Sequence, residues 1–143
     1  MNESTICREA MKDDLMKVFR EVSGSYSCRN NWEAWKRVVE HPAPRFYVDA
    51  RRAHQVISPM LHGDRSKLEE LSPLKRDMYE ALFDTVMSLW QRKAYWGKSL
   101  NYVLQFAVLE PAPRFYINAY RMGQIWRERT KRKKVGFIVN GDE

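Results

Sequence analysis

The sequence has few of the residues that build disulfide-rich, collagen-like or membrane-spanning proteins. Its 143 residues include only two cysteines, six glycines and six prolines. Two cysteines are too few for a disulfide scaffold, so we interpret Cys7 and Cys28 as reduced thiols of a cytoplasmic protein. The composition argues against disorder and low complexity. No run of about 18 apolar residues occurs, which predicts no membrane span, and the N-terminus lacks the pattern of a secretory signal.

The positive charge is concentrated near the C-terminus. The net charge of the chain is +7, whereas residues 1–71 carry 12 basic and 11 acidic residues. Residues 121–134 contain seven basic residues and one acidic residue. This distribution excludes a uniformly basic surface and favours a local cationic segment that contacts phosphates. A solvated basic tail without a partner is the alternative. The basic residues are Arg121, Arg127, Arg129, Lys131, Arg132, Lys133 and Lys134.

A nine-residue motif occurs twice in the chain. The segment PAPRFYVDA at residues 42–50 recurs as PAPRFYINA at residues 111–119, with six consecutive identical residues. The match continues beyond the motif and gives nine identities over sixteen positions. We therefore predict two related halves, about 6–62 and 73–128, inside one globular domain that spans residues 1–143.

The hydrophobic spacing predicts an all-α fold of about six helices, three in each half. Pro42 and Pro44 exclude regular helix in the motif, so an extended bridge should precede the third helix of each half. Asp49 and Asn118 are suited to cap these third helices. Residues 129–143 form a basic tail with an apolar end at 135–139, which could add an edge strand, dock on a partner or fray.

The helix predicted at residues 73–93 carries apolar residues on two faces. Leu74, Met78 and Leu82 begin one apolar row, and Tyr79 and Phe83 begin another. A helix of this kind is either central to a fold or part of an interface. We therefore keep a homo-oligomer through this helix as an alternative.

One interpretation of the repeated motif is structural. Phe46 and Phe115 would fill the core at two equivalent corners. Arg45 and Arg114 would donate hydrogen bonds to the free carbonyls at the C-termini of the preceding helices, where a cation is favoured. Duplication fits this interpretation, because both halves need the same corner.

A second interpretation is functional. Side chains at alternate positions of an extended segment share a face, so each arginine of the motif lies beside a tyrosine. Arg45 with Tyr47, and Arg114 with Tyr116, would then form two patches that contact phosphates and bases.

The order helix, connection, helix also suggests a helix-turn-helix element. The third helices would then read base edges. The connection of about seven residues is longer than the usual turn of three or four, which weakens this analogy. The reading side chains would be Arg51, Arg52, His54, Gln55, Tyr120, Arg121 and Gln124.

Catalytic and metal-binding patterns are missing from the sequence. It contains three histidines but no HExxH motif, no CxxC pair and no glycine-rich phosphate loop. We therefore expect no enzyme activity, no catalytic residue, no metal site and no cofactor.

The motif Pro-x-Pro-Arg-Phe-Tyr-Val/Ile resembles uncharacterised small helical proteins of gut bacteria, their phages and mobile elements. The resemblance covers mainly residues 42–57 and 111–126, and it implies a setting but no activity. From the charge pattern we predict a nucleic-acid-binding accessory protein, with duplex DNA as its partner and the 121–134 cations as phosphate contacts. A self-associating structural protein is the alternative.

Overall fold

The described part of the chain is all-helical, which confirms the predicted fold class. The computed structural model describes the backbone of residues 3–25 and 30–142, and the side chains of residues 5–24 and 30–131. Within these ranges it has no strand, and only one isolated β-bridge joins two loop residues. The elements are α1 (Glu3–Ser25), α2 (Asn31–Glu40), α3 (Ala50–Leu61), α4 (Ser66–Glu69), α5 (Pro73–Trp90), the 3-10 helix η1 (Lys93–Tyr95), α6 (Leu100–Ala107) and α7 (Ala119–Asp142).

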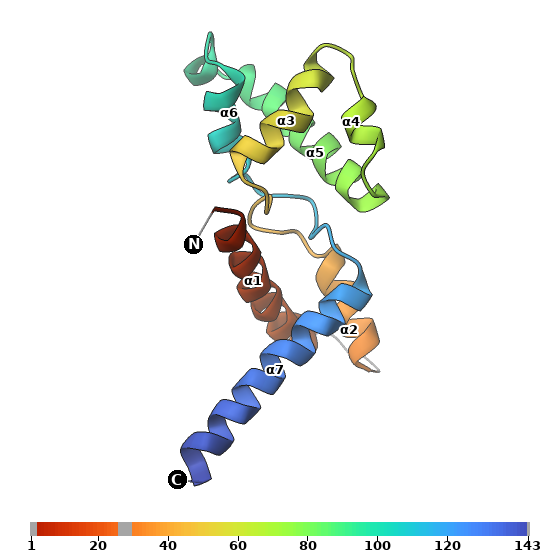
Figure 1. The fold of residues 1–143 in the computed structure, drawn as a ribbon, viewed down its shortest axis with the longest axis vertical. Helices are drawn as coiled ribbons and strands as arrows, with labels where there is room; N and C mark the ends of the chain where they lie inside the picture. Colours follow the sequence, from red (N-terminus) through yellow and green to blue (C-terminus); the bar gives the residue numbers. More distant parts are fainter. Residues whose placement is uncertain (1–2, 26–29, 143) are drawn as a thin grey trace.

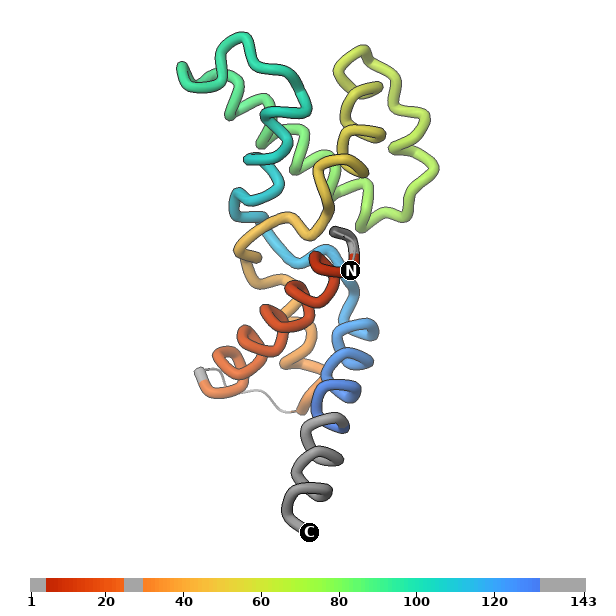
Figure 2. The backbone as a smooth tube through the Cα atoms, turned by 60° about the vertical axis from the view of Figure 1, so that its left-hand side comes forward, coloured from red at the N-terminus to blue at the C-terminus, as the bar shows by residue number. Residues whose placement is uncertain are grey.

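The helices form two lobes joined by two connecting segments, residues 41–49 and 108–118, which are called the waist below (Figures 1 and 2). In the lower lobe of Figure 1, α2 packs against both α1 and α7. In the upper lobe, α3 packs against α4, α5 and α6, and α5 packs against α6. The lower lobe therefore combines α1 and α2 of the first half of the sequence with α7 of the second half. The upper lobe combines α5 and α6 of the second half with α3 of the first half. The two halves exchange their last helices.

Two predictions about local structure are wrong. In a helix-turn-helix element the two helices pack against each other, whereas α2 and α3 lie in different lobes, as do α6 and α7. The chain between each pair crosses the waist, so neither pair can form this element. The edge strand considered for residues 135–139 is also absent, because the α7 backbone stays helical to Asp142.

The helix starts follow the capping chemistry expected from the sequence. The side chain of Asp49 accepts a hydrogen bond from the backbone N–H of Arg52 at 2.7 Å. The side chain of Asn118 accepts one from the N–H of Arg121, also at 2.7 Å. Each cap satisfies a backbone donor that lacks a partner within its own helix. The predicted starts of α3 and α7 are therefore confirmed.

One hydrophobic core runs through both lobes and the waist. On α5, Leu82, Val86 and Leu89 of the first apolar row and Tyr79 of the second row are buried, Phe83 is half-buried and Met87 is 40% exposed. The two apolar faces of α5 therefore make it central to this lobe. An oligomer interface through this helix stays a prediction.

Candidate nucleic-acid interface

The two copies of the motif pair with each other at the waist. The backbone N–H of Ala43 donates to the carbonyl of Ala112 at 3.0 Å, and the N–H of Ala112 donates to the carbonyl of Ala43 at 2.9 Å. Two further bonds flank this bridge. The N–H of Phe46 donates to Val108 at 2.9 Å, and the N–H of Phe115 donates to Val39 at 3.1 Å. The flanking bonds anchor each copy in the lobe that it enters, beside the helix that precedes the other copy, and the Ala43–Ala112 pair joins the two copies to each other.

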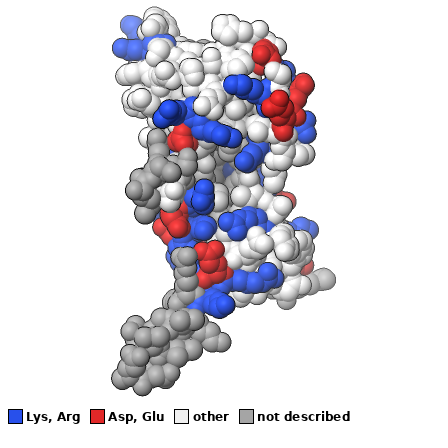
Figure 3. All heavy atoms as spheres, viewed as in Figure 1, with Lys and Arg blue, Asp and Glu red and all other residues white. Residues whose placement is uncertain are grey.

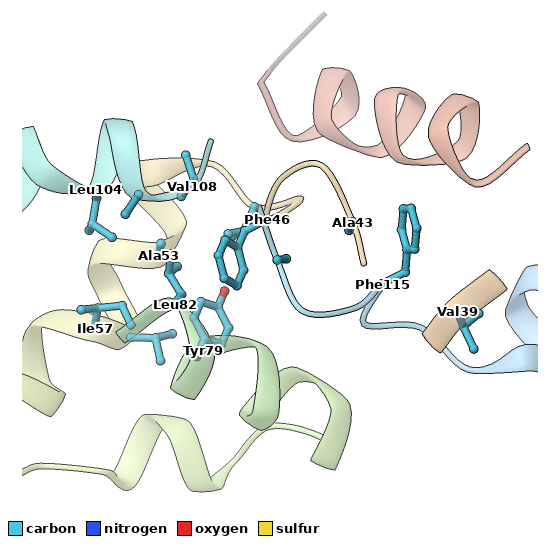
Figure 4. Packing of buried hydrophobic residues seen from close by; sticks show 14 of the residues in the cluster. Val39, Ala43, Phe46, Ala53, Ile57, Tyr79, Leu82, Leu104, Val108 and Phe115 are labelled. Carbon is cyan, nitrogen blue, oxygen red and sulfur yellow. The ribbon is translucent and has the colours of Figure 1, made fainter. Parts of the chain in front are cut away.

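The phenylalanines of the motif fill the core, as the structural interpretation expects. Phe46 is 1% exposed and Phe115 is fully buried. Figure 4 shows Phe46 directed toward Tyr79 in the upper lobe and Phe115 near Val39 in the lower lobe. The motif therefore contributes one buried ring to each lobe.

The tyrosines of the motif stack across the two copies. The Phe46 ring is stacked on the Tyr116 ring, with centroids 6.5 Å apart and planes 8° from parallel. The Tyr47 ring is stacked on the Phe115 ring, at 5.8 Å and 10°. Each stack joins one copy to the other, so these rings couple the two copies in packing as well as in hydrogen bonding.

The motif arginines lie differently from the structural prediction. That prediction was that the arginines donate hydrogen bonds to the carbonyls at the ends of the preceding helices. However, the carbonyls of Val39 and Val108 accept hydrogen bonds from the backbone N–H groups of the opposite copy. Instead, Nε of Arg45 donates to the carbonyl of Phe46 and Nε of Arg114 to that of Phe115, both at 3.0 Å. The prediction is wrong because it did not include the other copy as a donor.

Each arginine lies over the tyrosine two positions ahead. The Cζ atom of Arg45 is 5.8 Å from the centroid of the Tyr47 ring, and Cζ of Arg114 is 6.0 Å from the Tyr116 centroid. Cation–π attraction favours this position. The pairing of each arginine with a tyrosine permits the functional interpretation of the motif without favouring it.

The tyrosine hydroxyls lie in environments that favour their neutral form. The hydroxyl of Tyr47 donates to Oδ2 of Asp14 at 2.5 Å. Burial, and then this bond to a carboxylate, raise the pKa of Tyr47 well above its ordinary value of 10.0. Burial also raises the pKa values of Tyr79 and Tyr116. These groups stay protonated at neutral pH and act as hydrogen-bond donors or stacking surfaces.

Both pairs of motif side chains line one pocket of about 390 Å³ at the waist. Figure 3 shows Lys and Arg side chains on both sides of this junction. The structure thus brings together Arg45, Tyr47, Arg114 and Tyr116, which the functional interpretation had treated as two patches. Sequence reasoning missed Arg8 and Lys75, which also line the pocket, because no local pattern connects them with the motif. The remaining cation there is Arg52.

The second group of predicted residues lies on α7, outside the pocket. Arg127 and Lys131 are exposed, together with Tyr120 and Gln124. Positions 120, 124, 127 and 131 follow helical spacing, so they share one face of α7. This exposed side of α7, defined by Tyr120, Gln124, Arg127 and Lys131, is called the α7 face below.

The other predicted cations of α7 differ in their surroundings. Arg121 is half-buried, and its Nη1 lies 3.3 Å from Oε1 of Gln124. Arg129 faces α1, where its guanidinium pairs with Asp13 at 2.7 Å and with Glu9 at 2.9 Å. The predicted contacts Arg132, Lys133 and Lys134 have side chains outside the described residues. Arg129 is therefore the one described cation of this segment that is already neutralised by carboxylates.

Comparisons with known proteins give no match that bears on this site. Protein-family models, curated proteins and solved structures all give no match to the chain. In the part that the structure describes, no group of three or more His, Cys, Asp or Glu side chains is arranged to hold a metal ion. Among the same residues, no helix has the length and apolar character to cross a membrane.

Proposed function

We propose that this protein binds nucleic acid, with duplex DNA as the preferred form, through the α7 face and the basic residues that follow it. The observation that carries the proposal is the charge of one continuous helix. Residues 121–134 hold seven basic residues and one acidic residue, and all of them belong to α7. A dense row of cations on a helix is suited to phosphates, because each contact releases a condensed counterion.

Helix geometry supports contact with successive phosphates. A helix rises about 1.5 Å per residue, so the stretch from Arg127 to position 134 is about 10 Å long. Phosphates of one DNA strand advance about 3.4 Å along the duplex axis. The basic stretch of α7 therefore spans about three phosphates, and an α-helix also has the width to enter a major groove.

Fluorescence anisotropy with labelled duplex DNA, single-stranded DNA and RNA over a salt series tests the proposal. We expect binding that weakens with salt and is tightest for the duplex. The double variant Arg127→Gln with Lys131→Gln should weaken binding to every sequence and reduce the salt slope by about 2. Neutralising residues 131–134 together should have a larger effect in the same direction.

The matched control is Arg129→Gln. It removes one positive charge from the same helix, half of what the double variant removes, and Arg129 already contacts Glu9 and Asp13 on α1. We expect it to change the salt slope much less than the double variant. A change in salt slope from the control that is half that of the double variant would mean that only net charge matters, and no binding at low salt would refute the proposal.

The motif side chains enter the proposal as a second set of contacts. Arg45, Arg114, Tyr47 and Tyr116 would orient the bound strand. They lie in a recessed pocket of about 390 Å³, which is too small for a duplex but large enough for a single nucleotide, so they would contact a strand at its end. The resemblance of the motif to phage and mobile-element proteins fits an accessory role in such a setting.

The alternative function is self-association, and one surface of the upper lobe favours it. Tyr95, Tyr102 and Phe106 form an aromatic cluster, with centroids 5.2–6.3 Å apart. Tyr102 and Phe106 are 40% and 41% exposed. Sedimentation of the wild type and of Phe106→Ser discriminates the two functions. If the wild type is a dimer that does not bind DNA, and the dimer is lost in Phe106→Ser, self-association replaces nucleic-acid binding as the proposed function.

A further inference from the structure

The described residues that line the pocket at the waist carry more positive than negative charge. Five cations line it, two from the motif copies and three from α1, α3 and α5. Asp49 is the one carboxylate among the described residues that line it. Among the described side chains, none of these cations takes part in an ion pair. The five cations are Arg8, Arg45, Arg52, Lys75 and Arg114.

Other acidic groups near the pocket are engaged or peripheral. Asp14 accepts the hydrogen bond from Tyr47. The charge of Asp77 acts on the hydroxyl of Tyr116, and Asp49 caps α3. These three carboxylates are fewer than the five described cations that line the pocket.

The two motif arginines are part-buried and held in place. Arg45 donates to the carbonyl of Phe46, and its Nη2 lies 3.4 Å from Sγ of Cys7. Arg114 donates to the carbonyls of Phe115 at 3.0 Å and of Ile117 at 3.3 Å. Guanidinium groups that are fixed in this way lose little side-chain entropy when an anion arrives. Planar donors of this kind match the oxygens of a phosphate.

The pocket also has an apolar side. Met11, Met78 and Ile117 line it, together with the rings of Tyr47 and Tyr116. Its volume of about 390 Å³ lies within the range of small-molecule sites. A free inorganic ion would leave this side unused, whereas a ligand with a ring or an apolar body would cover it.

We propose that the pocket between the lobes binds an organic phosphate, such as a nucleotide or the 5′-phosphate end of a nucleic-acid strand. Arg45 and Arg114 hold the phosphate, and Arg8, Arg52 and Lys75 add to the positive potential around it. The tyrosine rings and the methionines contact the body of the ligand. This site does not depend on the α7 face, because none of the four residues of that face is among the described residues that line the pocket.

Isothermal titration of the full chain tests the proposal with three probes: adenosine 5′-monophosphate, adenosine and inorganic phosphate. We expect one molecule of the monophosphate per chain. Adenosine should bind at least about tenfold more weakly, because it makes no charge-assisted hydrogen bond. Inorganic phosphate should also bind about tenfold more weakly, because it does not cover the apolar side.

Variants assign the binding to this pocket. Arg8→Gln with Lys75→Gln removes two exposed cations that line it, so the fold is kept and affinity for the monophosphate should fall about tenfold. Arg51→Gln is the matched control, because Arg51 is exposed on α3 but does not line this pocket. Arg45→Gln and Arg114→Gln should each abolish most of the binding, with circular dichroism to verify that the variants are folded.

Two oligonucleotides distinguish the sources of the phosphate. In the Arg127→Gln, Lys131→Gln background, a 5′-phosphorylated strand that binds better than its 5′-hydroxyl form identifies a strand end. Binding of the monophosphate alone identifies a free nucleotide, and either result supports the site. The proposal is overturned if adenosine or inorganic phosphate binds as tightly as the monophosphate. It is also overturned if Arg51→Gln weakens binding as much as the pocket variants, or if no phosphate probe saturates at millimolar concentration.

Discussion

Replacing Gly123 with alanine tests the packing of α2 against α7. A Cβ atom built at Gly123 would lie 2.7 Å and 2.9 Å from two ring carbons of Trp35. Trp35 is 7% exposed, and its ring lies 5.8 Å from that of Trp126 and 5.4 Å from Cζ of Arg127. The indole is therefore enclosed and has little room to move.

Two opposing effects, helix propensity and overpacking, set the change in the free energy of unfolding of Gly123→Ala. Alanine is favoured over glycine inside a helix by about 1 kcal/mol. Overpacking a filled core costs about 1–3 kcal/mol, and two carbon contacts below 3.0 Å put this position at the upper end. We expect Gly123→Ala to lower the free energy of unfolding by about 1–2 kcal/mol. Urea denaturation followed by circular dichroism measures it.

Two further variants make this result specific. Gly24→Ala places the same methyl group on α1, where no atom lies within 4 Å of it, and should raise stability by up to about 1 kcal/mol. In a Trp35→Leu background the alanine at position 123 should cost less than in the wild type, since the clashing ring is gone. If Gly123→Ala is as stable as the wild type, Trp35 does not pack on α7, and the exchanged arrangement of the helices is refuted.

Four other substitutions test the waist and the contact between α7 and α1. Phe46→Ala and Phe115→Ala should each lower the free energy of unfolding by about 3–5 kcal/mol, and an unchanged urea midpoint would contradict their burial. Tyr47 has a pKa raised above 10.0 in the folded protein, so the folded state keeps a proton that the unfolded chain loses. Stability should therefore be retained below about pH 10 and fall above it. In urea titrations at pH 9–11, the free energy of unfolding of Tyr47→Phe should fall less steeply with pH than that of the wild type. An identical slope would argue against the raised pKa of Tyr47. Arg129→Gln should cost about 0.5–1 kcal/mol, because its carboxylate partners are largely exposed, and a thermal midpoint equal to that of the wild type would show that the pair contributes nothing.

The sequence predicted the features that depend on neighbouring residues. Asp49 and Asn118 cap their helices because a short acceptor three residues before a backbone N–H is a local condition. Phe46 and Phe115 are buried because a large apolar side chain follows a rigid Pro-x-Pro segment toward the core. The all-α class follows from the helical spacing of apolar residues on either side of these segments.

The exchange of the third helices was not predictable in the same way. A repeat indicates that two segments adopt similar local structure, but it does not tell whether each third helix packs within its own half. The bonds from Phe46 to Val108 and from Phe115 to Val39 decide it in favour of exchange. They satisfy carbonyls near the ends of α6 and α2, and this is why the motif arginines are not used there.

The exchange also explains why one pocket contains two arginines of the same motif. When two copies cross at the waist, side chains at equivalent positions gather around the crossing, and their charges add. A purely structural corner needs only a hydrogen-bond donor to the carbonyl of the next residue, which a neutral glutamine also supplies. Two charged groups facing one pocket repel each other unless an anion lies between them. Addition of a phosphate ligand should therefore raise the thermal midpoint of the wild type more than that of Arg45→Gln. Equal shifts would leave the structural interpretation of the motif as the better one.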